Sequence, residues 1–142
     1  MKLKVNKTHD SAKLPTYGTD GAAAFDLYSI NGGYMTRGDG LTVDTGLAFE
    51  VPEGHVMLVF SRSGHGFNHG IRLANSVGVI DSDYRGNVKV RLQCDGSHYT
   101  VDAGERIAQA MVLPVERVEF VDCEVLTETK RGKKGGGSTG LK

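Results

Sequence analysis

The residues of this sequence that are best suited to chemistry lie between two glycines, in the segment GVIDSDYRG at positions 78–86. Asp81 follows an apolar run and would lie at the mouth of a hairpin, where a carboxylate can orient a water molecule and partly deprotonate it. Tyr84 offers a flat apolar face to a sugar or a base. An isolated Asp-x-Asp is more often a solvated turn, so the catalytic interpretation depends on the tyrosine beside the carboxylates and on the flanking glycines.

Three further segments carry groups that bind anions. Arg62, in the segment SRSG at positions 61–64, can pair with phosphate oxygens in a bidentate manner, although Arg-Ser-Gly is also common in surface turns. Gln109 can donate its amide to a phosphate, or can face solvent at the start of a strand. In the glycine-rich segment at positions 131–140, successive backbone amides could enclose a phosphate. This segment is not a Walker loop, because its lysines precede the glycine run, and it could equally be a disordered tail.

Histidine and cysteine residues contribute less to this picture. His65 and His69 have the four-residue spacing of a helical metal site, but Gly66 and the flanking glycines argue against the helix that would align them. We therefore do not expect a metal there. Cys94 and Cys123 are far apart in sequence, and we expect two reduced thiols packed in the core rather than a disulfide.

Composition and charge exclude several classes of protein. The chain has 142 residues, enough for one domain, of which 39% are hydrophobic and 24% charged. No apolar run approaches the roughly 18 residues that cross a bilayer, and the N-terminus lacks the apolar region of a signal peptide, so we expect a cytoplasmic protein without membrane contact. The 17 basic and 17 acidic residues cancel, which argues against direct nucleic-acid binding. A basic cluster near the C-terminus, at Lys130, Arg131, Lys133 and Lys134, is better suited to a local anion site.

Short apolar runs separated by turn-forming residues predict the elements that must position these groups. Ten short strands are predicted, at residues 2–6, 24–28, 41–45, 47–51, 55–60, 77–80, 87–92, 99–101, 107–113 and 117–121. This pattern is typical of an all-β sandwich, jelly roll or barrel. At most one helical turn is expected, after Phe60, with Ser61 as its cap and with the glycines at 64, 66 and 70 ending it early. We expect one domain at residues 1–129 and a mobile glycine-rich arm at residues 130–142.

Five segments, taken in order, resemble the motifs of the trimeric dUTPase family. They are AAFDL at 23–27, SRSG at 61–64, GVIDSDYRG at 78–86, GERIAQ at 104–109 and the glycine-rich segment at 131–140. The resemblance implies a jelly-roll-like β-barrel that forms a homotrimer with three active sites between subunits. It also implies hydrolysis of dUTP to dUMP and diphosphate with Mg²⁺, which keeps uracil out of DNA and supplies dUMP for thymidylate synthesis.

The same resemblance assigns roles to residues by position. Asp81 would orient the water that attacks the α-phosphorus, and Tyr84 would pack against deoxyribose and so exclude the 2′-hydroxyl of UTP. Asn75 and the backbone around Val79 would contact the uracil edge. Asp26 would support Mg²⁺ through water, since the triphosphate supplies the inner oxygens. The arm would close over a neighbouring subunit's site. The substrate-binding residues implied in this way are Arg62, Ser63, Gly64, Asn75, Gly78, Val79, Ile80, Tyr84, Lys89, Gln109, Arg131, Gly136, Ser138 and Thr139.

The arm departs from the family pattern at two positions. Gly136 stands where the family usually has a phenylalanine that stacks on uracil, and Lys134 replaces a glycine. Loss of the stack should weaken closure of the arm by about 1–3 kcal/mol, partly offset by the positive charge of Lys133 and Lys134. His65 stands where the family often has an apolar residue, with no consequence that the sequence indicates.

Two other functions would use the same scaffold. A dCTP deaminase shares the fold and several motifs, but it needs a carboxylate on the strand after the third motif, and VKVRL at residues 88–92 has none. A regulatory protein that binds a partner under nucleotide control would carry the same motifs, and the sequence leaves this open as an added role.

Overall fold

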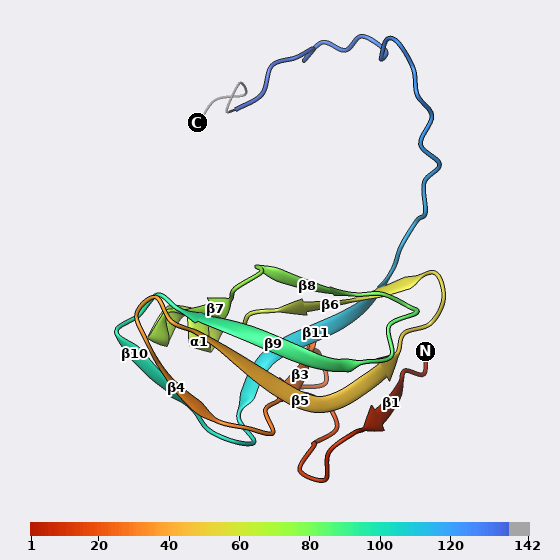
Figure 1. Cartoon of the computed structure of the whole chain (residues 1–142). Coiled ribbons are helices and arrows are strands. Elements are labelled where there is room, and N and C mark those ends of the chain that lie inside the picture. The colour runs from red at the N-terminus through yellow and green to blue at the C-terminus, as the bar shows by residue number, and fades with distance from the viewer. Residues whose placement is uncertain (137–142) are drawn as a thin grey trace.

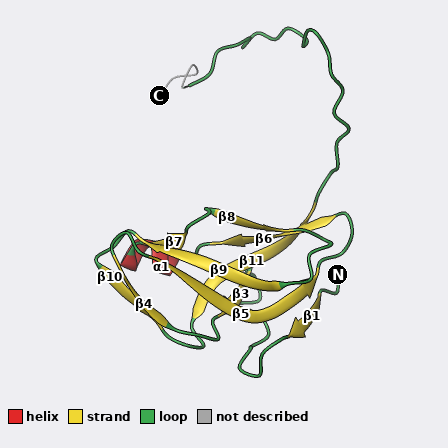
Figure 2. Ribbon diagram, in the orientation of Figure 1, coloured by secondary structure: helices red, strands yellow, loops and turns green. Residues whose placement is uncertain are grey.

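Strands dominate the computed structural model, which describes residues 1–136 (Figure 1, Figure 2). In chain order the elements are β1 (Lys4–Lys7), β2 (Thr16–Tyr17), β3 (Phe25–Tyr28), β4 (Gly33–Thr36), β5 (Gly40–Glu50), β6 (His55–Phe60), α1 (Ser63–His69), β7 (Ile71–Leu73), β8 (Val77–Ile80), β9 (Asn87–Cys94), β10 (His98–Val101) and β11 (Arg106–Pro114). The one helix among the described residues, α1, is too short to cross a membrane. The prediction of an all-β fold is confirmed.

The strands form three sheets in which every pairing is antiparallel. A four-stranded sheet has the order β1-β5-β9-β7, a five-stranded sheet has the order β2-β3-β11-β6-β8, and β10 pairs with β4. Many neighbours, such as β5 with β9 and β3 with β11, are distant in sequence, as is typical of jelly rolls. Within residues 1–136 the sheets do not join into one closed barrel, so the fold is jelly-roll-like but open between its sheets.

Side chains along β9 show how the core is built. Val88, Val90 and Leu92 are buried, whereas Lys89 and Arg91 between them are exposed, as expected for a strand with one face toward the interior. Buried side chains of β3, β5, β6 and β11 belong to the same hydrophobic cluster. The two larger sheets therefore share a single core, which supports the loops and strand ends that carry the polar groups.

The longest strand, β5, combines two of the predicted strands. The sequence suggested separate strands at residues 41–45 and 47–51, but the chain passes through Gly46 as a bulge in the β5–β9 pairing. Gly46 has a φ of 64°, and an added Cβ would lie 3.0 Å from the side chains of Ala12 and His9. Glycine is needed there for both reasons, and the strand bends without ending.

Other strand boundaries also differ from the prediction. The sequence pattern did not indicate β2, β4 and β7, which span only two to four residues and show little alternation. The predicted strand at residues 117–121 is not a strand in the structure, because no strand of the body lies beside it to share hydrogen bonds. Val118 and Phe120 in this segment are 67% and 93% exposed. After Pro114 the chain leaves the sheets as an extended segment (Figure 1).

The helix α1 forms despite its glycines, so the expectation that Gly66 and its neighbours would prevent a helix is wrong. Ser61 does not cap it; the Ser61 hydroxyl instead accepts the N–H of Leu73 at 2.9 Å, and Arg62 precedes the helix without a side-chain cap. Gly70 ends the helix with a φ of 65°, a left-handed conformation that favours glycine. Packing against the sheets stabilises this short helix, since its intrinsic propensity is low.

The two cysteines have different surroundings. Cys94 is buried in the core as expected, but Cys123 is exposed on the segment after β11, and both are free thiols. The prediction that both thiols pack in the core is therefore correct for Cys94 and wrong for Cys123.

Candidate functional site

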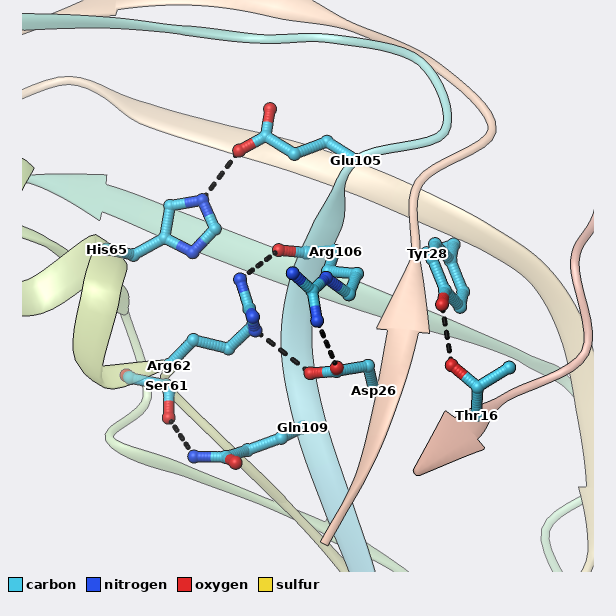
Figure 3. Close-up of polar contacts among 9 residues, drawn as sticks. All are labelled: Thr16, Asp26, Tyr28, Ser61, Arg62, His65, Glu105, Arg106 and Gln109. Atoms are coloured by element: carbon cyan, nitrogen blue, oxygen red, sulfur yellow. Dashed lines mark hydrogen bonds and ion pairs between the residues drawn. The ribbon is translucent and has the colours of Figure 1, made fainter. Parts of the chain in front are cut away.

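A buried carboxylate between two guanidinium groups (Figure 3) lines the first of the cavities that the predicted site residues share. Asp26 lies on β3 and is only 8% exposed. Its Oδ1 accepts the Nε–H of Arg62 at 2.9 Å, and its Oδ2 accepts an Nη1–H of Arg106 at 3.1 Å. Arg62 also donates to the backbone oxygen of Arg106 at 3.1 Å. These contacts hold both arginine side chains in the lining of the cavity.

Gln109 completes the wall of this cavity. On β11 it pairs in register with Asp26 on β3 and with Phe60 on β6, and its side-chain amide donates to the backbone oxygen of Ser61 at 2.9 Å (Figure 3). The cavity has a volume of about 370 Å³ and is also lined by Ser63 and by the small residues Gly18, Thr19, Ala22 and Ala24. With two guanidinium groups, a hydroxyl and an amide around one carboxylate, it is suited to an anion such as phosphate.

The second cavity lies at the hairpin between β8 and β9. It has a volume of about 510 Å³, and Asp81, Tyr84 and Lys89 are among the side chains that line it. Asp81 is exposed. The Tyr84 hydroxyl donates to the backbone oxygen of Asn87 at 3.0 Å, which holds the ring across the hairpin. This cavity combines an accessible carboxylate with an aromatic face, as the sequence predicted.

A smaller cavity of about 120 Å³ adjoins the second one. Four of the predicted substrate-binding residues line it, namely Asn75, Gly78, Val79 and Ile80. Asn75 is exposed at the turn between β7 and β8. The next residue, Ser76, has a φ of 63°, a left-handed conformation that is strained for a residue with a side chain. The structure thus gathers these residues with Asp81 and Tyr84 along the edge strand β8.

The two cavities lie at opposite ends of the β6–β8 pair. Phe60, two residues before Arg62, pairs with Val77, whereas Met57 pairs with Ile80, the residue before Asp81. These two pairs are three residues apart, which is about 10 Å along a strand. Asp81 lies beyond one end of that interval and Arg62 lies beyond the other. Within one chain, the Asp81 carboxylate is therefore kept apart from the cavity that Arg62 lines.

The described residues of the arm, 130–136, lie apart from both cavities. Arg131 and Gly136 are exposed, and Arg131 donates to the backbone oxygen of Lys134 at 3.0 Å. Figure 1 shows this segment away from the sheets. Ser138 and Thr139 lie outside the described residues. Gly64 is exposed on α1, and Lys89 Nζ lies 3.7 Å from the Asp44 carboxylate.

Sequence reasoning missed two features of the first cavity. Arg106 was part of a recognised motif but received no role, because its partner Asp26 is 80 residues away in sequence. The second feature is a partly buried contact near the cavity, where His65 Nε2 lies 2.6 Å from Oε1 of Glu105 (Figure 3). The only signal for it was that His65 departs from the apolar residue common in related motifs.

The fold thus carries two cavities. One is suited to phosphate, and the other can hold a ring against an aromatic side chain beside a carboxylate. This combination is typical of a nucleotide-binding protein. A family model described as dUTPase matches residues 10–140. The chain is 44% identical over 141 residues to the deoxyuridine 5′-triphosphate nucleotidohydrolase of Nautilia profundicola, with 99% of each chain covered. It is 39% identical over 142 residues to the protein of that name from Helicobacter pylori, with 99% of this chain and 98% of the relative covered. A solved dUTPase of Staphylococcus bacteriophage 80alpha with dUPNHPP has a TM-score of 0.92 at 25% identity, with 99% of each chain covered. The chain belongs to the dUTPase family.

Proposed function

We propose that this protein hydrolyses dUTP to dUMP and diphosphate, which lowers dUTP and supplies dUMP for thymidylate synthesis. The observation that carries the proposal is the pair of cavities, one with Asp81 and Tyr84 and one with two arginines, in a chain of the dUTPase family. The cytoplasm is its proposed location, because both cysteines are free thiols, which persist in a reducing compartment.

The hairpin cavity is proposed to hold deoxyuridine. The Tyr84 ring, anchored through its hydroxyl, gives the sugar a flat face and leaves no room for a 2′-hydroxyl. Val79, which is 61% exposed on β8, gives the uracil an apolar surface. Asn75 and the backbone beside Gly78 offer hydrogen bonds to the uracil edge, and a narrow pocket there excludes the methyl group of thymine.

Asp81 is proposed to act at the hydrolytic step. Its carboxylate accepts a hydrogen bond from a water molecule and orients the water oxygen toward the α-phosphorus. The new bond forms between that oxygen and the α-phosphorus while the proton that the water loses passes to the Asp81 carboxylate. The bond to the bridging oxygen breaks, so that diphosphate leaves with the bridging oxygen. Arg62, Ser63 and Gln109 bind phosphate oxygens and stabilise the negative charge that grows on the leaving diphosphate.

Mg²⁺ is the proposed cofactor, and the first cavity fits an ion that the substrate carries. Both oxygens of Asp26 already accept hydrogen bonds from guanidinium groups, which disfavours direct coordination of a cation. A carboxylate has about four acceptor positions, so Asp26 can still accept a hydrogen bond from a water molecule bound to the ion. When bound to the triphosphate oxygens, Mg²⁺ would neutralise part of their charge.

The distance between the cavities supports a site built from more than one chain. A water oriented by Asp81 must lie within hydrogen-bond reach of the carboxylate and close to the α-phosphorus. The phosphate groups next to that phosphorus need Arg62 and Ser63, which lie beyond the other end of the β6–β8 pair in the same chain. A neighbouring subunit can supply them instead, and we propose a homotrimer with three sites between subunits.

The segment after β11 gives further support for assembly. Several of its apolar side chains are almost fully exposed, with Phe120 at 93% and Val125 at 82%. Contiguous exposed apolar residues of this kind usually bind another surface, and a neighbouring subunit is the surface we propose. The arm at residues 130–142 would then lie over that subunit's site, with Arg131, Ser138 and Thr139 on the γ-phosphate and Gly136 near the uracil.

The proposal is tested by diphosphate release from dUTP, dTTP, dCTP and UTP, with ammonia release from dCTP measured in parallel. We expect turnover of dUTP alone. Asp81→Asn should abolish it, whereas Asp83→Asn, a matched change of charge two residues away on the same exposed hairpin, should retain it. Equal turnover of UTP would refute the role of Tyr84, and ammonia from dCTP would indicate a deaminase instead.

A further inference from the structure

A buried histidine forms a contact beside the first cavity that the proposed reaction does not use. His65 lies on α1 and is 6% exposed, and its Nε2 lies 2.6 Å from Oε1 of Glu105, the residue before β11 (Figure 3). The Tyr99 hydroxyl donates to the same oxygen at 2.5 Å. The Tyr99 ring meets the imidazole edge-on, with centroids 5.5 Å apart. Side chains from α1 and β10 thus meet at one oxygen of the carboxylate that precedes β11.

The charge state of Glu105 fixes the direction of the hydrogen bond. Burial raises the pKa of Glu105, but hydrogen bonds from the Tyr99 hydroxyl, the Asp102 N–H and His65 outweigh this effect, and the net shift of its pKa is downward. The carboxylate is therefore ionised at neutral pH and can only accept, so His65 Nε2 carries a proton and donates. Within residues 1–136, the buried Nδ1 of His65 has no hydrogen-bond partner. The imidazole is thus oriented by a single polar contact, the one to Glu105.

This contact joins α1, directly after Gly64, to the residue before β11, and neither of its side chains lines a cavity with Asp26 or Asp81. Two other contacts make the same connection, from Arg62 to the backbone oxygen of Arg106 and from Gln109 to the backbone oxygen of Ser61. Both are made by side chains that would bind phosphate, and each can be given up when the side chain turns to the substrate. His65 does not line either cavity. Its bond to Glu105 therefore persists while the other two are exchanged.

We propose that His65 is a positioning residue for triphosphate binding, which holds residues 61–64 against β11 through its hydrogen bond to Glu105 while Arg62 and Gln109 engage phosphate. The inference rests on the proposed function, because it takes Arg62 and Gln109 as phosphate ligands. The inference predicts different effects on the triphosphate end and on the nucleoside end of the substrate. Loss of the contact should weaken binding of the triphosphate and leave binding of the nucleoside unchanged, since the hairpin cavity lies at the far end of β8.

The test is isothermal titration of the full chain with two ligands, deoxyuridine and a non-hydrolysable imido analogue of dUTP with Mg²⁺. His65→Leu removes the donor and fills the buried space. His65→Gln places an amide nitrogen near the position of Nε2 and should restore the bond. Glu105→Gln removes the charged acceptor at nearly constant volume. His69→Leu is the matched control, because His69 is exposed on the same helix and its tilted ring lies 4.9 Å from that of Tyr99 without bonding to Glu105.

We expect His65→Leu and Glu105→Gln to lower the affinity for the imido analogue by about tenfold, equivalent to about 1.4 kcal/mol. The affinity for deoxyuridine should stay within a factor of two of the wild-type value. His65→Gln should recover most of the affinity, and His69→Leu should match the wild type. Unchanged affinity for the analogue in both His65→Leu and Glu105→Gln would overturn the inference. Equal weakening of both ligands would also overturn it, since that outcome indicates a general structural role. A wild-type protein that binds deoxyuridine but not the analogue would instead refute the proposed function, and this inference with it.

Discussion

Gly86 gives the sharpest test of how the hairpin cavity selects its substrate. A Cβ added at Gly86 would lie 2.5 Å from the hydroxyl oxygen of Tyr84 and 2.7 Å from its Cζ. The backbone at Gly86 does not have a positive φ, so alanine is compatible with its conformation. The effect of Gly86→Ala should therefore come from the Tyr84 ring, which lies directly against the glycine.

The size of the effect follows from that contact. The ring must recede by about 0.9 Å to reach the 3.4 Å at which ordinary contacts begin. This movement lengthens the 3.0 Å hydrogen bond from Tyr84 to the backbone oxygen of Asn87, whose loss costs about 0.5–1.5 kcal/mol. A displacement near 1 Å in a substrate-positioning group can lower a rate by up to about a hundredfold. We expect kcat/KM for dUTP to fall by about tenfold.

The ratio of kcat/KM for dUTP to that for UTP is the diagnostic measurement. A rigid ring against deoxyribose excludes a 2′-hydroxyl, and an apolar wall of this kind discriminates against an added hydroxyl by about a hundredfold. If the ring is displaced, the ratio of kcat/KM for dUTP to that for UTP should fall by about tenfold. The free energy of unfolding should change by less than about 1.5 kcal/mol, since Tyr84 is 43% exposed and few buried contacts depend on it.

Gly21→Ala is the matched control for this substitution, because a Cβ added at Gly21 meets nothing within 4 Å. We expect wild-type kinetics for it. Tyr84→Phe should keep most of the dUTP preference, because the ring stays while one hydrogen bond is lost. Should Gly86→Ala keep both the wild-type kcat/KM and the wild-type ratio, the ring would not be the element that excludes the 2′-hydroxyl.

Three further substitutions test other parts of the site. Asp26→Asn keeps one acceptor but loses the charge between Arg62 and Arg106, and should lower the free energy of unfolding by about 1–2 kcal/mol in urea denaturation; an unchanged midpoint would contradict this. The pKa of Glu105 is lowered from its ordinary value of 4.5, so its contribution to stability is present above pH 4.5 and is lost as the pH falls through the lower folded value. Glu105→Gln should accordingly flatten the decline of the unfolding free energy below pH 4.5, and a parallel decline in both proteins would refute the assignment. Gly136→Phe should lower KM for dUTP, because a base–aromatic stack contributes about 1–3 kcal/mol, and identical KM and kcat values would argue against a lid at that position.

The parts of the fold that follow from local patterns could be predicted from the sequence. Alternation along residues 87–92 indicated β9, and the apolar runs at residues 55–60 and 77–80 match β6 and β8. Residues 117–121 show the same alternation but are not a strand. Alternation shows which side chains are apolar, and it does not show whether a neighbouring strand exists within the chain. Likewise, glycine propensity argued against α1, and tertiary packing overrode it.

The candidate site was predicted where its residues are close in sequence. Asp81 and Tyr84 lie three residues apart, so a hairpin was sufficient to bring them together. The bond between Asp26 and Arg106 joins residues 80 apart, and no local pattern carries that information. The contact between His65 and Glu105 depends in the same way on a helix that was not expected and on the position of β11.

The charges of the first cavity explain why a glycine-rich arm with lysines would matter to this protein. The charged side chains that line the cavity within residues 1–136 are Arg62, Arg106 and Asp26, so they carry one net positive charge. A nucleoside triphosphate carries several negative charges, and a single net positive charge balances few of them. The proposed Mg²⁺ and another part of the protein would supply the rest. Lys133 and Lys134 bring positive charge to an arm with glycine at position 136, where the motif that the sequence resembles has an aromatic residue. Attraction to the triphosphate would therefore replace stacking on the base as the main force that closes the arm, and its closure should weaken as salt concentration rises.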